Sequence, residues 1–244
     1  TPEWIKSFGS PSNDGVTALT VDGAGNITAV GYDQASMDFG DAEPLMNLGQ
    51  ANDVFAVHLD ADGTYLWKKG FGKGGEQLPR AVTVDGLSGI YLAGEFGGTL
   101  DLDVQYVDPS APRDLFITRL AATTGVPTWS TTVADANIQP QLALAWNPTA
   151  GLAVAGSFAG AVNFGGGTVQ SDGVDAFVLA LDPAHAFSWQ KVFTGPGAQS
   201  ANAAAYDAAG ALFVTGDYAG PAVFDGASVQ SNGGLDLFVV KYAP

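Results

Sequence analysis

Asp175-Ala-Phe-Val-Leu-Ala-Leu-Asp182 is one of four related stretches in this chain. The others are Asp53-Val-Phe-Ala-Val-His-Leu-Asp60, Asp114-Leu-Phe-Ile-Thr-Arg-Leu-Ala121 and Asp236-Leu-Phe-Val-Val-Lys-Tyr-Ala243, and the first residues of successive copies lie 61 positions apart. A fixed period of this kind indicates a structural repeat that decides the whole fold. The repeat describes an architecture and names no substrate.

Three further strand-like segments recur with nearly the same period. One alternates small and bulky residues and ends in Asp or Asn, as in residues 18–22, 81–85, 143–147 and 203–207. The second is apolar and ends at Gly31, Gly94, Gly156 or Gly216, and the third begins at Trp4, Trp67, Trp129 or Trp189. Residues 198–211 are rich in alanine, which favours helix. Their alignment with Ala81-Val-Thr-Val-Asp85 nevertheless predicts a strand.

Each repeat therefore predicts four antiparallel main strands, with a Gly-rich insert that forms an extra hairpin between the second and third. Four-stranded sheets repeated around a channel are the blades of a β-propeller. Familiar propeller repeats are about 40–50 residues long, so a period of 61 leaves room for the hairpin. We expect an all-β protein with four blades, at about residues 14–72, 79–134, 140–194 and 200–244.

The last repeat has no Trp segment of its own, and the first Trp segment precedes the first repeat. We therefore expect residues 3–9 to form the outer strand of the C-terminal blade and close the ring as a monomer, which removes exposed sheet edges. Two alternatives remain open: half of an eight-bladed ring made by a dimer, and a fragment of a longer array.

Composition excludes several classes of protein. The 244 residues are 46% hydrophobic, which excludes a disordered chain. Nine Lys plus Arg stand against 25 Asp plus Glu, and a net charge of −16 repels phosphate backbones, so we expect no nucleic-acid partner. The absence of Cys excludes disulfides and thiolate sites. No apolar run approaches the roughly 20 residues of a membrane helix.

Residues 156–171, Gly-Ser-Phe-Ala-Gly-Ala-Val-Asn-Phe-Gly-Gly-Gly-Thr-Val-Gln-Ser, are followed by the 175–182 stretch and by Trp189. This pattern resembles the bacterial β-propeller repeat of myxobacterial secreted proteins and lipoproteins, and the likeness covers nearly the whole chain. The resemblance implies an extracellular or cell-surface scaffold or binding protein in a bacterium. It carries over no catalytic residue.

The most prominent carboxylates are the four that open the repeated stretch: Asp53, Asp114, Asp175 and Asp236. In a closed ring they would form a circle, and such a circle is a candidate ligand-binding site, with calcium as the cation to test. The alternative is structural: each Asp accepts backbone hydrogen bonds from a Gly-rich turn and fixes the start of its strand. Otherwise we expect no cofactor.

The remaining polar and aromatic candidates favour structure over catalysis. His58 aligns with Arg119, Ala180 and Lys241, which predicts an exposed or half-exposed side chain, and His185 lies in a turn. The sequence lacks the nucleophile, phosphate-loop and zinc motifs of common enzymes. We expect the four Trp side chains to pack between blades, although Trp also stacks on sugars.

The preferred hypothesis is a non-catalytic, lectin-like binding scaffold that contacts a glycan or protein through loops on one ring face. A second hypothesis is a metal-assisted hydrolase or lyase that uses the non-repeated acids Asp33, Glu95, Asp101 and Asp103. The third is a purely structural assembly module.

Overall fold

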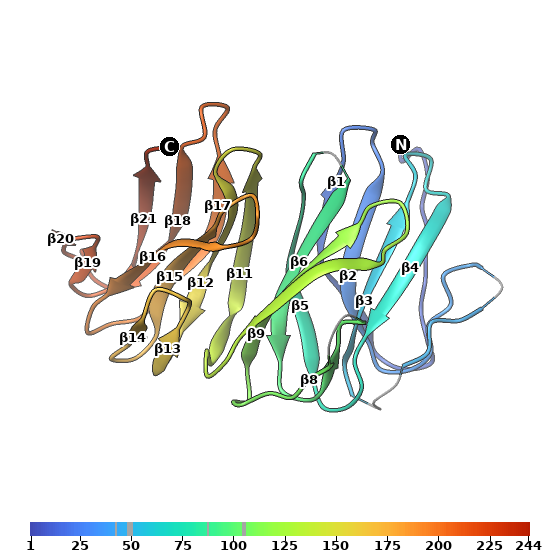
Figure 1. The fold of residues 1–244 in the computed structure, drawn as a ribbon, viewed down its shortest axis with the longest axis horizontal. Helices are drawn as coiled ribbons and strands as arrows, with labels where there is room; N and C mark the ends of the chain where they lie inside the picture. Colours follow the sequence, from blue (N-terminus) through green and yellow to red (C-terminus); the bar gives the residue numbers. More distant parts are fainter. Residues whose placement is uncertain (42, 48–50, 87, 104–105) are drawn as a thin grey trace. The chain divides into compact units, whose positions relative to one another are not determined.

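The computed structural model of the chain describes residues 1–41, 43–47, 51–86, 88–103 and 106–244. The regular elements in these residues are 21 β-strands, arranged in antiparallel sheets (Figure 1). The described residues contain no α-helix, and hence none that could cross a membrane. The prediction of an all-β protein is confirmed.

Each of the first two repeats folds as a four-stranded sheet. The first sheet has the order β1 (Asp14–Val21), β2 (Ile27–Asp33), β3 (Asp53–Leu59) and β4 (Tyr65–Phe71). The second has the order β5 (Gln77–Val84), β6 (Gly89–Phe96), β9 (Asp114–Ala121) and β10 (Pro127–Val133). These are the four main strands that the period predicts for each repeat.

The third repeat forms β11 (Ile138–Asn147), β12 (Gly151–Phe158), β15 (Asp175–Leu181) and β16 (Phe187–Thr194). The fourth sheet contains three strands, β17 (Gln199–Tyr206), β18 (Leu212–Ala219) and β21 (Leu235–Tyr242). The alanine-rich segment is thus a strand, as its alignment predicts, because its side chains pack against neighbouring sheets.

The predicted extra hairpins are present in three repeats. They are β7 (Leu100–Asp101) with β8 (Tyr106–Val107), β13 (Ala161–Asn163) with β14 (Thr168–Gln170), and β19 (Ala222–Phe224) with β20 (Ala227–Val229). In the first repeat the corresponding insert contains a single described bridge, between Met37 and Leu45. The hairpin β19–β20 belongs to the fourth repeat but pairs with β16 of the third sheet.

The chain divides into two compact halves. The N-terminal half comprises Thr1–Pro112 and Phe116–Thr132, and the C-terminal half comprises Arg113–Leu115 and Val133–Pro244. In the N-terminal half, β5 packs against β1 and β2 of the preceding sheet. In the C-terminal half, β17 packs against β11 and β12 in the same way.

Alternation of small and bulky residues explains this packing. The bulky side chains of β5, Val82 and Val84, lie in one hydrophobic cluster with the small Ala18 of β1. In the other half, Tyr206 of β17 lies in one cluster with Ala143 of β11. A strand with one small face and one bulky face therefore fits between two sheets, as the period-two pattern predicts.

Within each half, large aromatic side chains fill the space between the outer strand of one sheet and the next sheet. Phe193 of β16 contacts Phe224 and Phe238 of the fourth repeat, with ring centroids 5.0 and 5.4 Å apart. In the N-terminal half, Phe71 of β4 is buried in one cluster with Phe116 of the second sheet. Phe116 and Phe238 of the repeated stretches therefore lie between neighbouring repeats of the same half.

Residues 3–9 form no strand; only Gly9 makes a bridge, to Asp38. Trp4 Nε1 donates to the Ala61 carbonyl at 3.1 Å, and the Phe8 ring lies 5.4 Å from that of Phe39. The segment therefore packs on the first sheet. The sheet of the fourth repeat contains β17, β18 and β21, without residues 3–9. The predicted pairing of residues 3–9 with this sheet stays a prediction.

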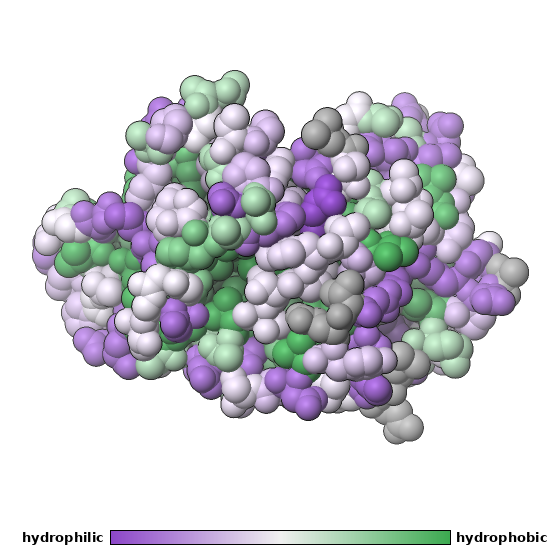
Figure 2. All heavy atoms as spheres, in the orientation of Figure 1, coloured by the Kyte–Doolittle hydropathy of each residue, from purple (hydrophilic) through white to green (hydrophobic). Residues whose placement is uncertain are grey.

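Apolar side chains remain at the surface of β21. Leu235, Leu237 and Val239 are 68%, 74% and 64% exposed, in a protein whose other third strands are almost fully buried. Figure 2 shows hydrophobic atoms at the surface over the neighbouring hairpin β19–β20. Exposed strand residues of this kind favour a further partner for this sheet.

Candidate functional site

The turns after the first and third strands lie at the same end of each sheet, because consecutive strands run in opposite directions. We call this the turn end, and we call the opposite end, which carries the inserted hairpins, the hairpin end. Asp22 Oδ1 accepts the main-chain N–H groups of Ala24 and Asn26, both at 2.8 Å. Asp60, Asp182 and Asp207 hold their turns in the same way. The turn end therefore presents loops of fixed conformation.

A cleft of about 210 Å³ opens at the turn end within the N-terminal half. One wall is the β1–β2 turn of the first sheet, and the other is the β5–β6 turn of the second sheet. The side chains and main chain that line it include Asp22, Gly23, Ala24, His58, Gly86, Ser88 and Ala122. The rims are therefore mostly main chain of glycine-containing turns, and the imidazole is the largest polar group in the lining.

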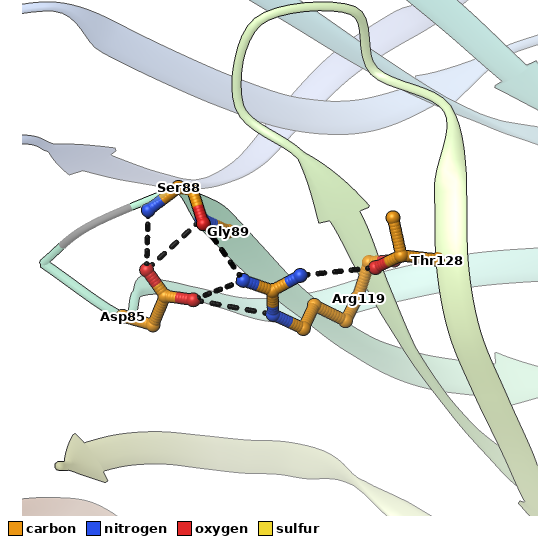
Figure 3. Close-up of polar contacts among 5 residues, drawn as sticks. All are labelled: Asp85, Ser88, Gly89, Arg119 and Thr128. Carbon is orange, nitrogen blue, oxygen red and sulfur yellow. Dashed lines mark hydrogen bonds and ion pairs between the residues drawn. The ribbon is translucent and has the colours of Figure 1, made fainter.

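An ion pair between Asp85 and Arg119 fixes the second wall of this cleft (Figure 3). Asp85 Oδ1 accepts the N–H groups of Ser88 and Gly89 at 2.9 Å each, while Oδ2 binds the guanidinium, with Nε at 3.1 Å. The guanidinium also donates to Thr128 Oγ1 at 3.1 Å. One arginine therefore ties the β5–β6 turn to β9 and β10.

His58 forms the base of the cleft and is only 4% exposed, so the prediction of an exposed histidine is wrong. Its ring stacks on Trp67 at a centroid distance of 5.1 Å, and Nδ1 lies 2.9 Å from Thr28 Oγ1. Burial lowers the pKa of His58, and the nearby charge of Asp22 offsets this only in part. The imidazole is therefore neutral at pH 7 and offers Nε2 as its second polar atom.

The pairing of a turn carboxylate with a cation on the third strand recurs along the chain. Asp85 faces Arg119, and at the same repeat positions Lys241 Nζ lies 3.6 Å from Asp207. In the first repeat, Asp22 stands opposite the neutral imidazole of His58. The third repeat has Asn147 and Ala180 at these positions, where the neutral Asn147 caps the turn through Oδ1. Both members are thus charged in the second and fourth repeats, and neither is charged in the third.

Sequence reasoning missed this pair, although the signal was available. The alignment of the repeats already placed a cation opposite Asp in three copies and Ala opposite Asn in the fourth. Each member was considered alone, His58 as a lone histidine and Asp85 as a turn residue. Comparing the two alignment columns together would have predicted the contact.

The four repeated Asp residues open the third strands at the hairpin end. Asp53, Asp114 and Asp175 are buried, and Asp236 accepts the Asn232 N–H. Burial and the nearby Asp172 raise the pKa of Asp175 to about 6, and backbone hydrogen bonds from Gly195 and Asp172 counteract them. A Cβ at Gly72 would collide with the carboxylate of Asp53. These contacts favour the turn-fixing role.

A shared ligand site for these carboxylates gains no support from their positions. Each lies at the start of the third main strand of its repeat, whereas the strands that pack on a preceding sheet, β5 and β17, are first strands. Within the described residues, no group of three or more His, Asp or Glu side chains is arranged to hold a metal ion.

The four non-repeated acids have separate partners. Glu95 pairs with Arg80, Asp101 accepts the Asp103 N–H at 2.9 Å, and Asp103 pairs with Lys69. Asp33 ends β2 at the hairpin end of the first sheet. These contacts do not assemble the four acids into one constellation.

The Trp and His candidates have structural neighbours. Trp67 Nε1 donates to the Ala122 carbonyl of the second sheet at 2.7 Å. Gly125 lies so close to the indole that an added Cβ would collide with it. This Trp therefore packs between two sheets, as predicted. The Trp189 ring lies 5.2 Å from that of Tyr242. His185 has a φ of 68° in the turn that begins at Asp182.

Comparison with known proteins identifies no relative: no family model matches the chain, and no curated protein is detectably similar to it. The likeness of residues 156–189 to the bacterial β-propeller repeat therefore stays a prediction. What the structure adds is the four-sheet repeat and the cleft at its turn end.

Proposed function

We propose that this chain is a closed four-bladed β-propeller that binds a ligand through the loops of its turn end and catalyses no reaction. The observation that carries the binding role is the cleft beside His58, whose two walls carry turn N–H groups bound by Asp22 and by Asp85. Loops held on a rigid scaffold are the usual place for binding residues in such folds.

Repeat-equivalent packing supports the closed ring. Trp4 donates to the Ala61 carbonyl of the first sheet as Trp67 donates to the equivalent Ala122 carbonyl of the second sheet. Residues 4–9 therefore occupy, on the first sheet, the place that β4 occupies on the second. The outer strand of a preceding blade would lie there, and β21 is the strand that would accept it.

The other sheets supply the register for this closure. Lys69 pairs with Ala56 in the first sheet, and Lys191 pairs with Val178 in the third. The repeat-equivalent pair is Lys6 with Val239. Closure in this register would cover the exposed apolar side chains of β21.

The cleft suits a small polar ligand, such as one sugar residue of a glycan, because its rims offer main-chain groups and its base offers an imidazole nitrogen. A protein ligand would contact the same turns over a larger area. The likeness to secreted bacterial repeats supports an extracellular or cell-surface location. The charge of −16 disfavours nucleic acid.

Gly23→Phe tests the cleft directly. A Cβ at Gly23 meets no atom within 4 Å and the backbone is not left-handed there, so the ring should enter the cleft mouth at little cost in stability. On a panel of bacterial and plant glycans, we expect the wild-type protein to bind one sugar class and the variant to bind it at least about tenfold more weakly, which corresponds to about 1.4 kcal/mol.

Gly173→Phe is the matched control, because Gly173 is equally open and lies in the C-terminal half, at the hairpin end. This variant should bind as the wild type does. Equal binding by the Gly23 variant would place the ligand elsewhere. No binding to any glycan, followed by no binding to surface proteins of the source cell, would leave a structural module.

A further inference from the structure

A second cavity, of about 320 Å³, lies at the hairpin end of the first sheet. The carboxyl-bearing residues Asp33 and Asp53 line it, and these two are paired directly across β2 and β3. Its apolar walls come from Leu45, Met46, Val54 and Phe71. Lys68 and Lys69 of β4 line it as well, so the cavity combines two carboxyl groups, two lysines and hydrocarbon surface.

Asp33 departs from the repeat at this position. Phe158 and Tyr218 pair across from the repeated Asp in the third and fourth sheets, as Asp33 does in the first, and Phe96 holds the same place in the second repeat. All three aromatic side chains are buried. Only the first repeat has a carboxylate in place of the aromatic ring. Because Asp is smaller than Phe or Tyr, the replacement opens space in the sheet and introduces an acidic group there.

The Asp33 carboxylate is 1% exposed, and its Oδ2 has no hydrogen-bond partner among the residues that the structure describes. A buried acceptor without a partner destabilises the fold, because it loses the hydrogen bonds that water would give it, and the effect is larger when the group is charged. Asp33 Oδ2 therefore destabilises the fold unless a ligand in the adjacent cavity donates a hydrogen bond to it.

The charged groups around Asp33 do not neutralise it. Asp14 of β1 and Asp53 of β3 are paired with it across the sheet. The lysines on the β4 wall are engaged elsewhere, Lys68 with Asp41 and Lys69 with Asp103. Burial, followed by repulsion from the two carboxylates, raises the pKa of Asp33 to about 7, against a hydrogen bond from Asn47.

We propose that this cavity binds a primary ammonium group on a short aliphatic chain, with Asp33 Oδ2 accepting from the ammonium and the apolar walls covering the methylene groups. A divalent metal ion fits less well, because hard cations take about six or more oxygen ligands, and the described residues offer no group of three or more acidic or His side chains arranged for one. This inference does not rest on the proposed function at the turn end.

The test is isothermal titration of the wild-type protein with n-butylammonium at pH 8 in 150 mM NaCl, with n-butanol as the uncharged probe. We expect saturable binding of the ammonium and none of the alcohol. Because Asp33 must be ionised to bind, affinity should fall roughly tenfold between pH 8 and pH 6, with a proton released on binding at pH 6.

Two variants separate the site from the general acidity of the protein. Asp33→Asn should weaken binding at least tenfold, and Asp33→Phe should abolish it while folding normally, since three repeats already carry an aromatic residue there. Asp62→Asn removes an exposed turn carboxylate and should change nothing. Absent wild-type binding, unchanged binding in Asp33→Asn, or Asp33-dependent binding of Ca²⁺ without the ammonium would overturn the proposal.

Discussion

Arg119→Ala is expected to lower the free energy of unfolding by about 3–5 kcal/mol, as for other buried ion pairs that lose one partner. The side chain of Asp85 is 6% exposed, and the guanidinium is its only cationic neighbour among the described contacts. Removing the arginine leaves the charge of Asp85 buried without the guanidinium that faces it. Urea unfolding followed by tryptophan fluorescence measures the change.

The third repeat suggests a second substitution that should restore the stability lost in Arg119→Ala. Asn147 and Ala180 hold the two equivalent positions without any charge, so Asp85→Asn together with Arg119→Ala should recover most of the lost stability. The double variant should lie within about 1.5 kcal/mol of the wild type, which gives a strong coupling energy in the double-mutant cycle. Additive losses would show that the ion pair does not organise the turn.

The stability of the protein is expected to depend on Asp33 between about pH 4 and pH 7. The folded-state pKa of Asp33 is raised to about 7 from an ordinary value near 3.8. A group with a raised folded pKa stabilises the fold fully below its unfolded pKa, and this contribution is lost as the pH rises through the folded pKa. At about 1.36 kcal/mol per pKa unit, the loss is on the order of 2–4 kcal/mol.

Asp33→Asn isolates this effect, because other groups titrate in the same range. Burial also raises the pKa of Asp175 to about 6, which has the same sign, whereas the lowered pKa of His58 makes the fold less stable as the pH falls. The difference in unfolding free energy between the variant and the wild type should be smallest at pH 4 and should shift in favour of the variant as the pH rises to 7. A difference that does not change with pH would contradict a buried, titrating Asp33.

The strand arrangement could be predicted because it depends on periodicity within the chain. The 61-residue repeat aligned the alanine-rich β17 with three better strand sequences, and that alignment outweighed the helix propensity of its residues. The inserted hairpins followed from the Gly-rich copies. Patterns of this kind are local in sequence, so they survive without knowledge of the tertiary packing.

The site could be predicted less well, because burial depends on neighbours that are distant in sequence. His58 aligns with two charged residues and an alanine, yet Trp67 of the adjacent strand stacks on it and excludes water. Asp33 lies two residues after the aligned Gly31, where the other repeats have an aromatic residue, but only the register of β2 against β3 shows that it stands opposite Asp53. The cleft needs two turns from different repeats, which no single motif contains.

A disulfide cross-link tests the closed propeller most directly. The chain has no Cys, so Lys6→Cys with Val239→Cys introduces the only two thiols. Paired residues of antiparallel strands have Cα atoms about 4.5–5.5 Å apart, within the roughly 4.4–6.8 Å that a disulfide spans.

Lys6→Cys with Asp172→Cys is the control, since residue 172 lies in an exposed loop of the third repeat, away from the proposed pair. After mild oxidation, the proposed ring predicts an intramolecular disulfide at monomer mass in the first variant and none in the second. Disulfide-linked dimers would indicate a larger ring made by two chains, and unlinked monomers would contradict closure by residues 4–9.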